Sequence, residues 1–179
     1  LLVVSACSTE SPGSDNGEGS SSEGDSDDSV KVGLSISTLN NPFFVTLRDG
    51  AEAAAEEAGY EIVVTDAQDD ASSQLSDIED LLQQEIDVLL VNPVDSEAVV
   101  TAIESANTQD VPVITVDRST EGGEVVTHIA SDNVAGGEMA GEYIAEQLGE
   151  SGSVVELQGV PGASATNERG EGFHNIVDD

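Results

Sequence analysis

From residue 30 onward, short apolar runs alternate with longer stretches in which apolar residues recur at helical spacing. The run 87–91 is almost continuously apolar, as expected of a strand covered on both faces. Strands that alternate with helices through short loops build a parallel sheet with helices on both sides. The sequence therefore predicts an α/β protein with a doubly wound parallel sheet. We expect strands at 31–37, 60–65, 87–91, 111–116, 125–129 and 153–157, and helices at 42–58, 71–84, 96–108, 132–148 and 165–177.

Local signals define the ends of one predicted helix and the inner face of another. For the helix 42–58, Asn41 stands at the N-cap position, Pro42 at the first helical position and Gly59 just past the end. In the helix 71–84, four apolar residues share one face, which indicates the side that packs on the sheet. They are Leu75, Ile78, Leu81 and Leu82.

Polar and aromatic side chains gather directly after the predicted strands, where open parallel sheets bind their ligands. Asn, Asp and Arg side chains hydrogen-bond hydroxyl groups in pairs, and aromatic rings pack against the apolar faces of sugars. Polar groups of this kind without an evident nucleophile or metal favour the binding of a sugar. The candidates are Ser37, Asn41, Phe43 and Phe44 after the first strand, Asn92 after the third, Asp117 and Arg118 after the fourth, and Arg169 beyond the run 153–157.

Each candidate also has a purely structural interpretation. Helix capping alone explains Asn41. One ring of the pair Phe43 and Phe44 is expected to point into the core. The neighbours Asp117 and Arg118 can form an ion pair, and Asn92 precedes a proline, as turn residues often do. The shared position of these residues at strand ends is what favours a binding site.

Charge limits the partners of this chain. It carries 37 Asp and Glu against 4 Lys and Arg, a formal net charge of −33. This balance excludes binding of nucleic acid through a basic patch and argues against a polybasic membrane face. An acid excess with so few cations is typical of proteins from saline surroundings, where salt screens the repulsion between carboxylates. The alternative is an ordinary acidic protein, whose surface usually mixes both signs.

The first 28 residues differ in composition from the rest. Residues 1–7 read as the end of a signal peptide that closes on Cys7, the single cysteine, which excludes an internal disulfide. Residues 8–29 are rich in Ser, Gly, Asp and Glu, so we expect a disordered acidic tether. The chain does not begin with Met and ends without a stop in its pattern, so we expect a fragment.

Several long stretches closely resemble the periplasmic ribose-binding protein family. They are STLNNPFFVTLRDGA (37–51), VNPVDSEAV (91–99), VPVITVDR (111–118), HIASDNVAGGEMAGEYIA (128–145) and ELQGVPGASATNERGEGF (156–173). The resemblance covers nearly all of the chain after residue 30. It implies the type I periplasmic-binding-protein fold, in which two α/β lobes close on a ligand about a hinge.

The resemblance also implies a function and a division of the chain. Such proteins capture a monosaccharide and deliver it to the permease and ATPase of an ABC importer. For this chain the resemblance favours ribose over allose, xylose or galactose. The first lobe would span 30–131, nearly complete but without its C-terminal return segment, and a truncated second lobe would begin at 132. A fragment lacking half of the site is expected to bind sugar poorly. Positions matching the family's ribose contacts are Ser37, Asn41, Phe43, Phe44, Asn92, Asp117 and Arg118 in the first lobe and Arg169 in the second.

The same resemblance places the protein outside the cytoplasm. Residues 4–7 resemble a lipobox, at which Cys7 would be lipidated and the protein anchored to the outer face of the cytoplasmic membrane. A lone cysteine in an apolar stretch can instead be buried and inert. We expect a monomer with no cofactor.

The sequence also bears on three other classes of protein: a repressor, an enzyme and a sensor. A repressor of the lac type shares this fold but needs a basic helix-turn-helix before the first strand, where this chain is acidic. An enzyme is disfavoured because no nucleophilic triad is evident and His128 and His174 lack the spacing of metal ligands. A sensor that presents bound sugar or an autoinducer to a chemoreceptor remains open from the sequence.

Overall fold

A computed structural model describes residues 29–178 of the chain. The predicted lipidation site Cys7 and residues 8–28 of the predicted tether lie outside the described residues. Within the described part, no helix is long and apolar enough to cross a membrane. The elements are β1 (Lys31–Ile36), α1 (Pro42–Ala58), β2 (Glu61–Asp66), α2 (Ala71–Gln83), β3 (Val88–Val91), α3 (Val100–Thr108), β4 (Val113–Val116), β5 (Thr127–Ile129), α4 (Asn133–Leu148) and α5 (Ser164–Val177).

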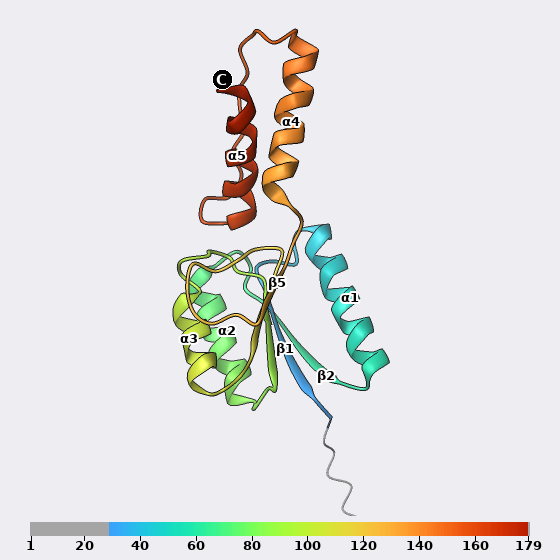
Figure 1. Ribbon diagram of the computed structural model, residues 1–179. Helices are drawn as coiled ribbons and strands as arrows, with labels where there is room; N and C mark the ends of the chain where they lie inside the picture. The colour runs from blue at the N-terminus through green and yellow to red at the C-terminus, as the bar shows by residue number, and fades with distance from the viewer. Residues whose placement is uncertain (1–28, 179) are drawn as a thin grey trace, which may run out of the picture.

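Five parallel strands form one sheet in the order β2-β1-β3-β4-β5. Helix α1 covers one face of the sheet, and α2 and α3 cover the other (Figure 1). The order reverses at β1, which lies between β2 and β3, so the chain winds outward in both directions. The predicted doubly wound α/β fold is confirmed, and we call residues 29–131 the sheet unit.

Apolar side chains fill both sides of this sheet, as a parallel sheet between two helix layers requires. On the side of α1, Leu34 and Ile36 of β1 pack with Phe44. On the other side, Leu89 and Val91 of β3 pack with the inner faces of α2 and α3. Neighbouring residues of one strand therefore serve different cores, and the strand ends are held rigidly between them.

The helix ends follow the sequence signals in α1 and depart from them in α3. Asn41 Oδ1 accepts a hydrogen bond from Phe43 N at 3.0 Å, and Gly59 ends the helix with a φ of 73°. Both predictions are confirmed. Helix α3 begins at Val100, later than the predicted residue 96. Asp95 Oδ1 accepts hydrogen bonds from the N–H groups of Glu97 and Ala98, which closes a separate turn before the helix.

Helices α4 and α5 lie side by side as a second body beyond the sheet unit (Figure 1), and we call them the helix pair. Glycines let their backbones touch. A side chain at Gly137 would collide with the backbone of Arg169, and one at Gly172 would collide with that of Val134. Later residues of α4 contact later residues of α5, so the two helices run parallel, as expected of helices joined by a crossover segment.

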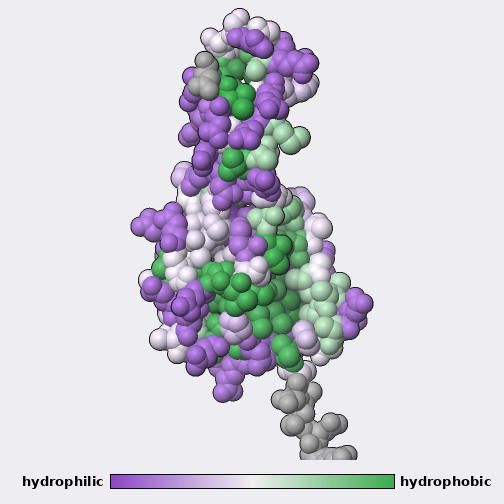
Figure 2. Space-filling model, viewed as in Figure 1, coloured by the Kyte–Doolittle hydropathy of each residue, from purple (hydrophilic) through white to green (hydrophobic). Residues whose placement is uncertain are grey.

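The predicted strand at 153–157 is wrong. These residues belong to the crossover segment 149–163 between α4 and α5, and they pair with no strand between residues 29 and 178. Val155 is 89% exposed and Leu157 is 92% exposed. A strand needs a neighbour for its backbone hydrogen bonds, which an apolar pattern by itself does not supply. Figure 2 shows hydrophobic residues gathered over the sheet unit, whereas the helix pair presents a mostly hydrophilic surface with smaller hydrophobic patches.

Candidate functional site

Ser37 and Asn92 join the carboxyl ends of three strands. Ser37 Oγ donates to Asn92 Oδ1 at 2.6 Å, and Asn92 Nδ2 donates to the carbonyl of Val116 at 3.0 Å. Both side chains are fully buried. The structure therefore brings these two predicted site residues together, with their polar atoms satisfied by β1 and β4 rather than exposed. Such a network fixes the floor on which the neighbouring side chains stand.

Asp117 turns the chain sharply just after β4. Its φ is 63°, a left-handed value that is uncommon for a residue other than glycine. Arg118 N donates to the carbonyl of Val116 at 2.7 Å, which closes a γ-turn around Asp117, and Asp117 N donates to the carbonyl of Ile129 at 2.8 Å. Such backbone strain costs on the order of 1–3 kcal/mol and gathers at functional sites. It keeps two charged side chains next to each other at the sheet edge.

The guanidinium of Arg118 is held from three directions. Its Nη1 donates to the carbonyl of Pro93 at 3.0 Å and to that of Val94 at 3.4 Å. Its Cζ lies 5.1 Å from the centre of the Phe44 ring, within the range of a cation–π contact. Its Nε lies 3.9 Å from Asp117 Oδ2.

Burial is the main influence on the pKa of Arg118 and lowers it, while the charges of Asp117 and Asp69 oppose that effect. A guanidinium ordinarily holds its proton far above neutral pH, so Arg118 is cationic. Its side chain is still 12% exposed. A guanidinium has five N–H donors in a rigid fork, so donors remain for a ligand beside the acceptor oxygens of Asp117.

The two phenylalanines divide as their spacing on one helix predicts. Phe44 is 3% exposed and belongs to the core beside α1, whereas Phe43 is 54% exposed. Their rings meet edge to face at 5.3 Å. Phe43 thus presents an aromatic surface to solvent, and Phe44 supports the guanidinium of Arg118. Asn41 is exposed at the N-cap of the same helix, and only the carbonyl oxygen of its side-chain amide takes part in the cap.

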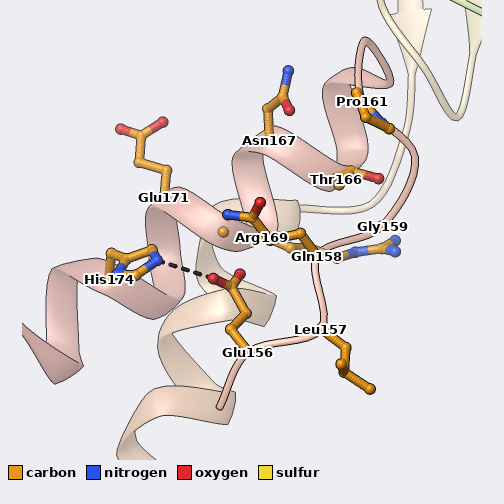
Figure 3. A pocket seen from close by; sticks show the side chains of 11 residues that line it. Glu156, Leu157, Gln158, Gly159, Pro161, Thr166, Asn167, Arg169, Glu171 and His174 are labelled. Carbon is orange, nitrogen blue, oxygen red and sulfur yellow. Dashed lines mark hydrogen bonds and ion pairs between the residues drawn. The ribbon is translucent and has the colours of Figure 1, made fainter. Parts of the chain in front are cut away.

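Arg169 is the predicted site residue that the structure does not bring to this cluster. It lies on α5 and lines a hollow of about 580 Å³ on the helix pair (Figure 3). None of the predicted residues of the sheet unit lines that hollow. His174 borders it and bridges Glu156 Oε2 at 3.0 Å and both carboxylate oxygens of Asp178 at 3.1 Å. Hydrogen bonds to Asp178 and then to Glu156 raise the pKa of His174.

The helix pair meets the sheet unit directly beside Arg118. Ser119 N donates to Ser164 Oγ at 2.8 Å, and Ser96 N donates to the carbonyl of Gly162 at 2.9 Å. The segment before α5 therefore rests on the loops that follow β3 and β4. Across residues 29–178, no three His, Cys, Asp or Glu side chains are arranged to hold a metal ion.

Sequence reasoning missed Gln74, which the structure places underneath the loop after β3. Its side chain is buried on the sheet-facing side of α2, and its amide bonds to Asn92 and Val94. A signal was available. Gln74 lies four residues before Ile78 and so shares the apolar face of its helix, where a polar residue needs a buried partner.

These features define a class: an α/β protein whose parallel sheet carries paired polar side chains and an aromatic ring at its carboxyl edge, where open parallel sheets bind their ligands. The chain belongs to the periplasmic binding protein family, because the periplasmic binding protein domain matches residues 32–179. It is 54% identical to the ribose import binding protein RbsB of Bacillus subtilis over 99% of this chain and 57% of that protein. It is 52% identical to the ribose import binding protein RbsB of Escherichia coli over 82% of this chain and 49% of that protein.

Solved structures give the same result. A myo-inositol binding protein of Caulobacter, bound to myo-inositol, is similar with a TM-score of 0.79 and 35% identity, over 83% of this chain and 51% of that one. An ABC transporter solute binding protein of Mycobacterium smegmatis with bound glycerol has a TM-score of 0.78 and 36% identity, over 83% of this chain and 52% of that one. The chain thus spans about half the length of the curated relatives that it matches.

Proposed function

We propose that this protein is an extracytoplasmic binding protein, without enzymatic turnover, that captures ribose or a similar monosaccharide and delivers it to an ABC importer. The observation that carries the proposal is the fixed guanidinium of Arg118, which rests over Phe44 beside Asp117 at the carboxyl edge of the sheet. The names of the similar proteins from Bacillus subtilis and Escherichia coli, both ribose import binding proteins, favour import over the presentation of a sugar to a sensor.

The proposed contacts follow from the chemistry of each group. Arg118 donates to ring hydroxyls with the N–H groups that the carbonyls of Pro93 and Val94 leave free, and Asp117 accepts from neighbouring hydroxyls. The exposed ring of Phe43 packs on the apolar face of the sugar. Asn41 supplies a further amide contact. Ser37 and Asn92 are fully buried, so their part in the proposed site is to hold in register the strand ends that carry the other contacts.

The proposal includes two lobes and an anchor. The first lobe spans 30–131 and the second begins at 132, with Arg169 reaching the sugar from the second lobe on closure. The contact between Ser119 and Ser164 supports this, because it already joins the segment before α5 to the loop beside Arg118. Cys7 carries the lipid that holds a monomer at the outer face of the membrane by the tether 8–29. The acidic surface suits saline surroundings.

The proposal is tested by titrating the full gene product with D-ribose, D-xylose and D-galactose in a calorimeter. We expect ribose to bind most tightly. Arg118→Lys keeps the charge but loses the planar fork, so ribose binding should weaken by about 10- to 100-fold, the loss of one or two charge-assisted hydrogen bonds.

Arg48→Lys is the matched control, because the Arg48 guanidinium pairs with Asp49 and Glu52 of its own helix and with none of the proposed ligand contacts. It should leave the affinity for ribose unchanged. No heat of binding with any pentose or hexose, or equal effects of the two Arg→Lys changes, would contradict the proposed function.

A further inference from the structure

Gln74 has three hydrogen-bond partners outside its own helix, one on strand β1 and two in the loop after β3. It projects from α2 and is buried. Its Nε2 donates to the carbonyl of Asn92 at 2.9 Å and to Ser35 Oγ at 3.2 Å. Its Oε1 accepts from Val94 N at 2.7 Å. Both ends of this amide are therefore satisfied, which is what keeps a polar group stable at such a depth.

These bonds orient the two peptide groups on either side of Pro93. The Pro93–Val94 peptide gives its N–H to Gln74 on one side, and its carbonyl accepts from Arg118 Nη1 at 3.0 Å on the other. The Asn92–Pro93 peptide has no N–H, and its carbonyl accepts from Gln74. Each peptide plane that could swing is thus fixed by one side chain. The oxygen that receives Arg118 has its direction set by Gln74.

We propose that Gln74 is a positioning residue of the ligand site, which acts through the loop 92–94 to aim the guanidinium of Arg118. The inference rests on the proposed function, because the guanidinium is the group assigned to the sugar. Gln74 itself does not reach the ligand, since it is buried beneath the loop. Its contribution is to hold the guanidinium in place before binding, so that no affinity is lost in ordering it.

The test uses the full gene product and D-ribose. Gln74→Met keeps the size and the burial but removes both donors and the acceptor. We expect ribose to bind about 10- to 100-fold more weakly, because the loop carbonyls are no longer held. In an Arg118→Lys background the same change should weaken binding less than about threefold, because residues that act through each other do not add.

Gln74→Glu gives an independent readout. A protonated carboxyl group reproduces the two bonds of Gln74 to the loop, with its O–H donating to the carbonyl of Asn92 and its carbonyl oxygen accepting from Val94 N. The carboxylate cannot donate. Ribose affinity of this variant should therefore recover toward the wild-type value as the pH falls from 8 to 5, whereas wild-type affinity should change little. A flat profile for Gln74→Glu would overturn the positioning role.

Ile78→Ala is the control for stability, because Ile78 lies one turn further along the same face of α2 and belongs to the apolar core. It should lower the melting temperature and leave ribose affinity within about threefold of wild type. Wild-type affinity in Gln74→Met, or losses that multiply independently with Arg118→Lys, would overturn the inference and leave the proposed function intact.

Failure of the wild-type protein to bind any sugar would remove the proposed function instead. In that case the positioning role is decided by NMR. Gln74→Met should speed amide exchange at Val94 and free the rotation of the Arg118 guanidinium, and Ile78→Ala should do neither. Unchanged signals in Gln74→Met would overturn the role.

Discussion

In the sheet unit, α2 and α3 bury whole Ile and Leu side chains against β3, whereas in the helix pair α4 and α5 bury mainly glycine, alanine and one asparagine. The first arrangement removes large apolar surface from water. The second brings two backbones into contact, which favours dispersion and exact fit over the area of surface buried. Large side chains of α4 such as Met139 and Tyr143 are left outside that contact, at 69% and 64% exposed.

The difference shows that a helix in an α/β fold must satisfy two separate packing requirements. Small residues such as Gly137 and Gly141 determine which neighbouring helix it touches and how closely. Large apolar residues determine which sheet it covers. In the sheet unit both packing requirements are satisfied between residues 29 and 131. In the helix pair only the requirement for a close helix contact is satisfied by the described residues, as the exposed Met139 and Tyr143 of α4 show.

The largest effect is expected from truncation in the core of the sheet unit. Ile103→Ala should destabilise the sheet unit by about 2–5 kcal/mol, because it leaves a cavity under a fully buried side chain of α3. Met139→Ala, the matched change in the helix pair, should stay within about 0.5 kcal/mol. Chemical denaturation of the full gene product, followed by amide exchange in each body, measures both. Equal losses would break the distinction between the two bodies.

A smaller destabilisation is expected where α4 touches α5, here from an added side chain instead of a removed one. Gly137→Ala should destabilise the helix pair by about 1–3 kcal/mol, because its Cβ would meet the backbone oxygen of Arg169 and lie 2.8 Å from Phe173 N. The adjacent Gly136 has nothing within 4 Å. Gly136→Ala should therefore stabilise α4 by about 0.5–1 kcal/mol. Amide exchange along α4 reports both changes, and equal signs for the two would show that the close backbone contact is absent.

The smallest effect concerns the crossover segment of the helix pair. Hydrogen bonds raise the folded pKa of His174 above its ordinary value of 6.5, so the protonated ring stabilises the contact with Glu156 and Asp178. That contribution is fully present below about pH 6.5 and is lost as the pH rises through the folded pKa. Amide exchange near Glu156 should therefore quicken with pH beyond its intrinsic dependence. His174→Gln should leave only the intrinsic pH dependence of amide exchange near Glu156. If the additional increase with pH persists in this variant, His174 is not its cause.

Much of the fold could be predicted because its signals are local. The cap at Asn41, the glycine at position 59 and the apolar face of α2 lie within a few residues of the structure that they determine. The strand ends can also be located from the sequence, which is why Phe44, Asp117 and Arg118 are candidates from position alone. The prediction of a strand at 153–157 is wrong because the apolar pattern of this segment is local, whereas strand pairing depends on a neighbouring strand.

The sequence by itself determined the family, the alternation of strands and helices, and the edge at which polar side chains collect. The tertiary structure decided what each of those side chains does. It closed Ser37 on Asn92, strained Asp117 into a γ-turn and placed Gln74 of α2 under the loop that receives Arg118. The physical reason is range: periodicity and caps act over a few residues, whereas the hydrogen-bond partners of Ser37 and Gln74 lie 18 to 55 positions away in the chain and meet them only when the sheet has formed.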